Sequence, residues 1–226
     1  MTIKREIKSF VRRAGRTTVR QQQGLEVHLA RYMLQNEGVI WDFEAIFERI
    51  ADTVVEIGFG MGASLLEMAK NNPELNYIGV EVHEAGLGNL AAGLAEAEIT
   101  NVRIVAMDAM EVFRSCIKDG SLRGIQIFFP DPWPKKRHHK RRLVQPAFVS
   151  TLSKKLQKDG FLHCATDWEA YALYMRDVLN QEVALRNEHP DGGFLPRPAF
   201  RPYTKFELRG SKLGHGVFDL FFLRNK

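Results

Sequence analysis

The central part of the chain alternates short apolar runs with longer segments whose apolar residues recur every three or four positions. The apolar runs predict strands at 53–58, 77–82, 102–107, 124–129 and 161–165. The periodic segments predict helices near 63–71, 84–97, 109–118, 146–157 and 167–180. Strands that alternate with helices predict a parallel sheet, and strands that are apolar on both sides predict helices on both of its faces.

Weaker patterns flank this central part. Short amphipathic helices are predicted at 25–35 and 43–50, and two later strands at 183–186 and 217–223. Between those strands, the prolines and the glycine pair of residues 190–202 predict a surface loop of the kind that often forms a lid. Thr204 and Glu207 have the spacing of a capping box, and Gly214 is placed to end the short helix that would follow.

Length and charge bound the kind of molecule. The 226 residues, 45% of them hydrophobic, predict one domain at 25–226 behind a basic arm at 1–24. Residues 1–20 carry a net charge of +6 and residues 135–142 another +6, which leaves 5 − 6 − 6 = −7 for the remainder. Two basic segments on an acidic body indicate a polyanionic partner, although either segment alone is equally consistent with a solvated tail or loop.

Several classes of protein are disfavoured. The sequence contains no apolar run of membrane-spanning length and no signal-peptide core, so we expect a soluble cytoplasmic protein without a membrane partner. Cys116 and Cys164 lack the spacing of a disulfide framework or a metal site, and we expect both to be buried. His138 and His139 have no partner at ligand spacing, so no metal is expected. The sequence leaves open whether the protein is a monomer or a homodimer.

A glycine-rich segment, EIGFGMG at 56–62, closes the first predicted strand. Gly58 and Gly60 permit the tight turn and the close backbone approach that a nucleotide-like cofactor needs. The segment also fits a dinucleotide site in which Glu81 binds ribose hydroxyls, so a nicotinamide-dependent oxidoreductase is an alternative. Glu56 and Asp108 favour a cationic sulfonium cofactor over a pyrophosphate, because opposite charges attract. A purely structural role for Glu56 is the weaker interpretation, since buried unpaired acids are costly.

The fourth predicted strand runs into PDPWP at 130–134 and then into the basic tract at 135–142. The prolines end the strand, so the chain leaves the sheet as a stiff loop with Asp131 at its root. A carboxylate beside a phosphate-binding tract predicts a site that holds a nucleic-acid base. Trp133 either stacks on a base or braces the loop. Asp167 either caps the next helix or binds substrate.

Together these motifs resemble the bacterial tRNA (guanine-N7-)-methyltransferase family through nearly the whole chain. The shared motifs are EIGFGMG at 56–62, GVEVH at 79–83, FFPDPW at 128–133, ATDWE at 165–169 and TKFE at 204–207. The basic arm, with SFVRR at 9–13, also resembles the start of this family's members. The glycine motif is common to many S-adenosylmethionine enzymes, whereas FPDPWPKKRH and TKFE are specific to this family.

The resemblance implies a class I S-adenosylmethionine-dependent methyltransferase with a Rossmann-like α/β sheet. It implies methyl transfer to N7 of the variable-loop guanine, position 46, of tRNA. A non-catalytic RNA-binding protein on the same fold is the second alternative. The residues expected to contact S-adenosylmethionine are Glu56, Gly58, Gly60, Glu81, Asp108 and Asp131. Those expected to bind the substrate are Lys135, Asp167, Thr204, Lys205, Phe206 and Glu207, and those expected on the RNA backbone are Arg137, His138, His139, Lys140, Arg141 and Arg142.

The chemistry of guanine N7 limits what the catalytic residue must do. N7 carries a lone pair and no proton that has to leave, so positioning and electrostatics should dominate catalysis. Asp131 is the expected catalytic residue, because its carboxylate can stabilise the positive charge that grows on the base. Either Asp131 or Asp167 can accept the N1 and N2 hydrogens of guanine.

Overall fold

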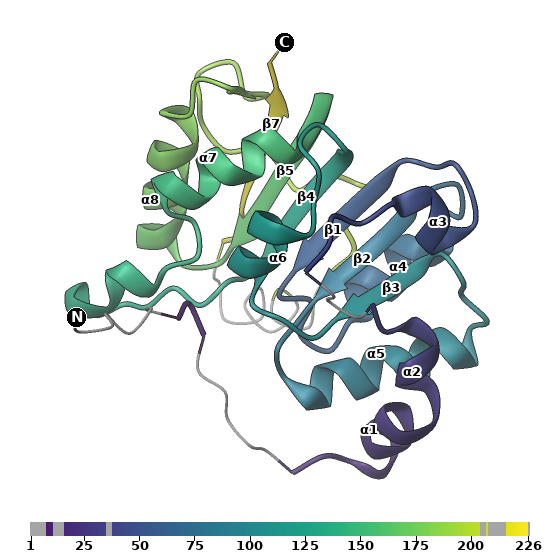
Figure 1. Cartoon of the computed structure of the whole chain (residues 1–226). Helices are drawn as coiled ribbons and strands as arrows, with labels where there is room; N and C mark the ends of the chain where they lie inside the picture. The colour runs from purple at the N-terminus through teal and green to yellow at the C-terminus, as the bar shows by residue number, and fades with distance from the viewer. Residues whose placement is uncertain (1–7, 11–15, 35–37, 204–206, 208–215, 226) are drawn as a thin grey trace, which may run out of the picture.

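A seven-stranded sheet forms the centre of the molecule (Figure 1). The computed structural model describes residues 8–10, 16–34, 38–203, 207 and 216–225. The strand order is β3-β2-β1-β4-β5-β7-β6. The strands are β1 (Thr53–Ile57), β2 (Asn76–Val80), β3 (Val102–Val105), β4 (Leu122–Phe128), β5 (Leu156–Thr166), β6 (Leu185–Asn187) and β7 (Phe218–Arg224).

Helices cover both faces of this sheet, as predicted (Figure 1). Val55 and Ile57 of β1 pack into the core on one face, and Val54 packs into the core on the other, because successive strand residues point to opposite sides. The first face is covered by α3 (Phe43–Phe47), α6 (Ala109–Ser115), α7 (Pro146–Lys155) and α8 (Glu169–Asn180). The second is covered by α2 (Leu29–Tyr32), α4 (Ala63–Asn71) and α5 (Glu84–Glu96).

The direction of the strands brings several carboxyl ends to one edge of the sheet. Strands β1 to β5 pair in parallel, whereas β7 is antiparallel to both β5 and β6. The parallel pairing and both late strands are confirmed, but the reversed direction of β7 was not predicted from its apolar pattern. Phe218 pairs with Thr166 and Leu223 pairs with Phe161, so β7 begins at the edge where β5 ends.

The first helical run starts earlier than the predicted residue 25. Thr18 is the N-cap of helix α1 (Val19–Gln23). Its hydroxyl accepts from the Gln21 amide, and the Gln21 side-chain oxygen accepts from the Thr18 amide. This reciprocal capping box satisfies two backbone donors that helix starts leave without partners. The run continues through the π-helical turn η1 (Gly24–His28) into α2, and α1 and η1 pack along α5.

The start of β5 and the loop before β7 also differ from the prediction. Strand β5 begins at Leu156 rather than at 161, and its pairing with β4 shifts register between Leu122 and Gly124. The 190–202 loop lies largely at the surface, but the Leu195 amide donates to the carbonyl oxygen of Asp219 over 2.9 Å, and Arg201 is fully buried. The loop is therefore anchored to β7 by two of its residues.

Three smaller predictions have different outcomes. Cys116 and Cys164 are buried and form no disulfide bond, as predicted. The N-cap of α8 is Trp168, with no side-chain capping bond, so of the two roles considered for Asp167 helix capping is wrong. Thr204 and Gly214 lie outside the described residues.

No helix in the part of the chain that the structure describes is both long and apolar enough to cross a membrane.

Candidate active site

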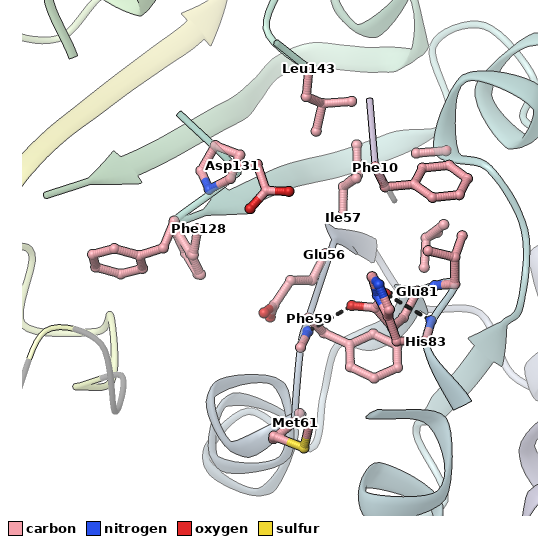
Figure 2. A pocket seen from close by; sticks show the side chains of 18 of the residues that line it. Phe10, Glu56, Ile57, Phe59, Met61, Glu81, His83, Phe128, Asp131 and Leu143 are labelled. Atoms are coloured by element: carbon pink, nitrogen blue, oxygen red, sulfur yellow. Dashed lines mark hydrogen bonds and ion pairs between the residues drawn. The ribbon is translucent and has the colours of Figure 1, made fainter. Parts of the chain in front are cut away.

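A pocket of about 440 Å³ opens where β1, β2 and β4 end (Figure 2). Ligands of open α/β sheets bind at this carboxyl edge. The glycine loop after β1, the end of β2 and the loop after β4 form its walls, and Ser9 and Phe10 of the N-terminal segment complete them. Of the residues predicted to contact the cofactor, Glu56, Gly58, Gly60, Glu81 and Asp131 line the pocket, whereas Asp108 does not.

The glycine loop has a backbone that side chains disfavour. Gly58, Gly60 and Gly62 have φ angles of +72°, +57° and +76°. A Cβ atom at Gly62 would lie 2.8 Å from Leu90, so this glycine is required by packing against α5. A Cβ atom at Gly58 or Gly60 would meet no atom within 4 Å. The loop thus presents bare backbone to open pocket space, which suits close approach of a ligand.

Glu81 ties this loop to the end of β2. One carboxylate oxygen accepts from the Gly60 amide over 3.0 Å, and the other accepts from the Val82 amide over 2.6 Å and lies 2.8 Å from Nδ1 of His83. The second oxygen also accepts from the His83 amide over 3.1 Å. Spare acceptor capacity for a ligand hydroxyl therefore lies on the first oxygen, which among the described residues accepts only the Gly60 bond. Sequence reasoning identified Glu81 but missed His83, which also lines the pocket.

Glu56 brings a buried carboxyl group to the pocket wall. Its side chain is 2% exposed, and Oε2 has no hydrogen-bond partner. Burial raises the pKa of Glu56 to about 8, because the charged form loses its hydration. On the neighbouring strand, the side chain of Gln126 is also buried, and its Oε1 likewise lacks a partner. Buried polar atoms of this kind are normally satisfied by a ligand or by water.

Asp108 has a different position from the one expected. Its Oδ1 accepts from the Met110 amide over 3.0 Å and caps α6, and its Oδ2 lies 2.8 Å from Nζ of Lys8. The flanking residues Met107 and Ala109 line the pocket instead. Asp108 therefore holds the N-terminal segment beside the pocket.

The loop after β4 holds Asp131 between two residues with left-handed backbone. Phe129 has a φ angle of +52° and Trp133 one of +44°, which is uncommon for residues other than glycine. The Phe129 amide donates to the Ala165 carbonyl over 2.8 Å, and Nε1 of Trp133 donates to the Ser9 carbonyl over 3.1 Å. These bonds stabilise the strained loop, so Trp133 has the bracing role considered above. Figure 2 shows Asp131 and Glu56 at the same pocket.

The basic tract forms a short surface helix, η2 (Lys136–Arg141). The residue after this helix, Arg142, is buried, with 4% of its surface exposed. Its Nε donates to the Pro132 carbonyl over 2.9 Å, and its guanidinium lies 4.8 Å from the Tyr171 ring centroid. The expectation that Arg142 contacts an RNA backbone is therefore not supported, because this side chain stabilises the Asp131 loop against α8. On the surface, the Arg141 guanidinium lies 5.1 Å from the ring centroid of Trp133.

Asp167 follows β5 at the same edge of the sheet as Asp131. Phe128 at the end of β4 pairs with Ala165 of β5, so the two loops leave adjacent strands side by side. The Asp167 side chain is exposed. Both carboxylates are thus accessible at one edge of the sheet.

A buried ionic cluster lies between β5, β7 and the 190–202 loop. Arg201, 0% exposed, makes two hydrogen bonds to Asp219, of 2.8 and 2.9 Å, and two to Glu207, of 2.7 and 2.9 Å. Nε2 of His163 lies 2.7 Å from Asp219, and burial lowers the pKa of His163. Glu207 is therefore engaged inside the protein rather than free for substrate. Thr204, Lys205 and Phe206 lie outside the described residues.

Comparisons with known proteins agree with this geometry. Residues 51–220 match the family model described as "Putative methyltransferase". The 16S rRNA methyltransferase KamB has the same fold, with a TM-score of 0.58 and 13% identity over 83% of this chain and 95% of that chain. The aminoglycoside resistance methyltransferase NpmB1 has a TM-score of 0.55 and 12% identity over 81% of this chain and 95% of that chain. Fold and pocket define a class I methyltransferase whose cofactor is S-adenosylmethionine.

Sequence relatives identify the family. A tRNA (guanine-N(7)-)-methyltransferase of Legionella pneumophila (strain Paris) is 57% identical over 99% of this chain and 95% of its own. One from Mannheimia succiniciproducens is 50% identical over 98% of this chain and 89% of its own. The chain belongs to the tRNA (guanine-N7-)-methyltransferase family. The oxidoreductase and the non-catalytic RNA-binding alternatives are therefore wrong.

Proposed function

We propose that the protein transfers the methyl group of S-adenosylmethionine to N7 of the guanine at position 46 in the variable loop of tRNA. The observation that carries this proposal is one pocket that joins a buried carboxyl group, a bare glycine loop and the Asp131 loop. We also propose that the enzyme acts in the cytoplasm without a metal ion, as a monomer or homodimer. Among the described residues, no group of three or more potential metal ligands occurs.

The pocket fits the chemistry of the cofactor. Oε2 of Glu56 is buried without a partner, and an ammonium group would both satisfy it and favour its charged form. Glu81 retains acceptor capacity for ribose hydroxyls, while Gly58 and Gly60 leave room for close contact with the loop backbone. Asp108 would act indirectly, without contacting the cofactor, by holding α6 and Lys8 in place.

The reaction requires little acid–base chemistry from the protein. The bound cofactor supplies an activated methyl group. Guanine N7 would donate its lone pair to the methyl carbon, the electron pair of the broken carbon–sulfur bond would pass to sulfur, and no proton would have to leave N7. Positive charge moves to the base, so the carboxylate of Asp131 stabilises the product-like charge distribution. Asp167 at the adjacent strand end is the second carboxylate available to the N1 and N2 hydrogens.

Basic side chains beside the pocket are proposed to hold the tRNA. Lys135 is proposed to bind next to the target base, and the side chains proposed for the RNA backbone are Arg137, His138, His139, Lys140 and Arg141. Arg142 is left out, because it is buried under the Asp131 loop. Thr204, Lys205 and Phe206 remain proposed substrate contacts, and Glu207 is proposed to act through Arg201.

Methyl transfer to tRNA transcripts tests the proposal directly. Wild-type enzyme, labelled S-adenosylmethionine and an unmodified transcript should give label at N7 of guanine 46, and a transcript with adenine there should stay unlabelled. Asp131→Ala should lower turnover by about 100-fold or more even at saturating S-adenosylmethionine. Label on another base, or no label on any tRNA while the cofactor is bound, would refute the assignment of the substrate. Normal turnover of Asp131→Ala would refute its catalytic role.

A further inference from the structure

The glycine loop is held on its outer side by a chain of polar side chains that does not line the pocket. Nδ2 of Asn89, in α5, donates to the carbonyl oxygen of Met61 over 2.6 Å. Oδ1 of Asn89 accepts from Arg20, in α1, over 2.8 Å. Met61 lies between Gly60 and Gly62, which both have positive φ angles, so Asn89 bonds the loop where its backbone is least restricted by side chains.

Arg20 is itself fixed by a second residue of α5. Its Nε and Nη2 donate to the two carboxylate oxygens of Glu96 over 2.9 and 2.8 Å, which makes a bidentate pair. The hydrogen bond from Arg20 holds the pKa of Glu96 below its ordinary value. Nη1 of Arg20 donates both to Oδ1 and, over 3.3 Å, to the backbone carbonyl of Asn89, so the fixed guanidinium orients the Asn89 amide with Nδ2 towards Met61.

Two further contacts join the same elements. Nε2 of Gln21, the neighbour of Arg20, lies 3.6 Å from the Met61 sulfur, while its Oε1 is engaged in the α1 capping box. A Cβ atom on Gly86 of α5 would lie 2.2 Å from the Gly60 carbonyl, so α5 and the loop are in direct backbone contact. The loop therefore has an inner support from Glu81 and an outer support from α1 and α5.

We propose that Asn89, oriented by Arg20, is a positioning residue that sets the affinity for S-adenosylmethionine by fixing the Met61 carbonyl. The inference rests on the proposed cofactor site. Without the Asn89 bond, the three glycines sample additional backbone states, and binding has to select the competent one. Arg20 counts among the cations of the basic N-terminal region, and its exposed guanidinium is engaged by Glu96 and Asn89 of the same chain.

Cofactor titration of purified variants by calorimetry, without tRNA, tests this role. Asn89→Ala should weaken S-adenosylmethionine binding by about threefold to fivefold, the size of one net hydrogen bond. Asn89→Asp should weaken it further, because it keeps the acceptor for Arg20 and turns a carboxylate oxygen towards the Met61 carbonyl. Arg20→Ala should have a smaller effect in the same direction. The double variant Arg20→Ala, Asn89→Ala should bind no worse than Asn89→Ala, since both changes remove one linkage.

The controls separate positioning from loss of fold or of charge. Arg16→Ala removes a cation of the same region and Asn71→Ala an exposed amide of α4, and both should leave affinity unchanged. The KM for tRNA should stay within about twofold in Asn89→Ala, because the change affects only the glycine-loop wall of the pocket and not the proposed tRNA surface. Unchanged cofactor affinity in Asn89→Ala and Asn89→Asp, or equal losses for cofactor and tRNA, would overturn the inference. A wild-type protein that fails to bind S-adenosylmethionine would instead overturn the proposed function.

Discussion

Glu56 shows how one side chain can lower stability in order to bind a ligand. Its pKa of about 8 lies above the ordinary value of 4.5, so the folded chain holds a proton that the unfolded chain releases between these pH values. The free energy of unfolding must therefore fall as pH rises from about 4.5 to about 8. A cationic ligand beside Oε2 reverses this effect, because it stabilises the carboxylate.

Replacement of Glu56 separates its cost to stability from its contribution to ligand binding. Glu56→Gln should resemble the wild type in thermal stability near pH 5 and become the more stable protein as pH approaches 8, by an amount on the order of a few kcal/mol. It should also bind S-adenosylmethionine more weakly. Thermal unfolding at several pH values, without cofactor, measures the first effect. Glu67→Gln, on the exposed side of α4, is the control, and the same pH trend in both variants would contradict the role of Glu56.

The elements at the carboxyl edge of the sheet depend on ionic contacts between distant segments. Arg201 joins the end of a surface loop to β7 through Asp219, and His163 extends this linkage to β5. Removing one member of a buried ion pair leaves the others uncompensated, which costs about 3–5 kcal/mol. The cluster therefore stabilises the C-terminal elements against the core strands as one unit.

Arg201→Leu should accordingly lower the free energy of unfolding by about 3–5 kcal/mol. Denaturant unfolding gives the value directly. The matched control is Arg186→Leu, which removes an exposed arginine from β6 and should change stability by less than about 1 kcal/mol. Similar values for the two variants would show that the cluster contributes little to stability.

Local patterns predicted the elements more successfully than the contacts between them. Continuous apolar runs and glycine spacing identify β1 to β5, the glycine loop and Glu56, because each depends on a few consecutive residues. Arg142 shares its basic surroundings with the residues before it, so nothing local marked it as buried. Arg201 finds its partners in β7 and at residue 207, and Lys8 meets Asp108 a hundred positions away. Pairings of that range leave no periodic trace in a single sequence.

Across the whole molecule, the charged groups proposed to bind the cofactor are buried, whereas those proposed to bind tRNA lie at the surface. The cofactor pocket encloses Glu56 and Glu81, which are both buried, whereas the proposed tRNA surface carries exposed cations. Salt screens exposed charges strongly and buried ones weakly. Ionic strength should therefore change tRNA binding much more than cofactor binding.

Binding of tRNA at a series of salt concentrations tests this division. Lys135→Ala and Arg141→Ala should each weaken binding and reduce the slope of log affinity against log salt by about one. Lys118→Ala, an exposed cation just beyond the end of α6 that lies towards the opposite edge of the sheet, should leave the slope unchanged. Unchanged slopes in the first two variants would show that the tract lies off the RNA path.

The reversed direction of β7 has a practical consequence for handling the protein. Because this strand starts beside the pocket and runs away from it, Arg224 at its end pairs with Leu185 at the remote edge of the sheet. Ser9 and Phe10, by contrast, are part of the pocket wall. A fluorescent reporter attached beside Arg224 should therefore leave catalysis unchanged, whereas the same reporter attached beside Ser9 would disturb the wall of the pocket.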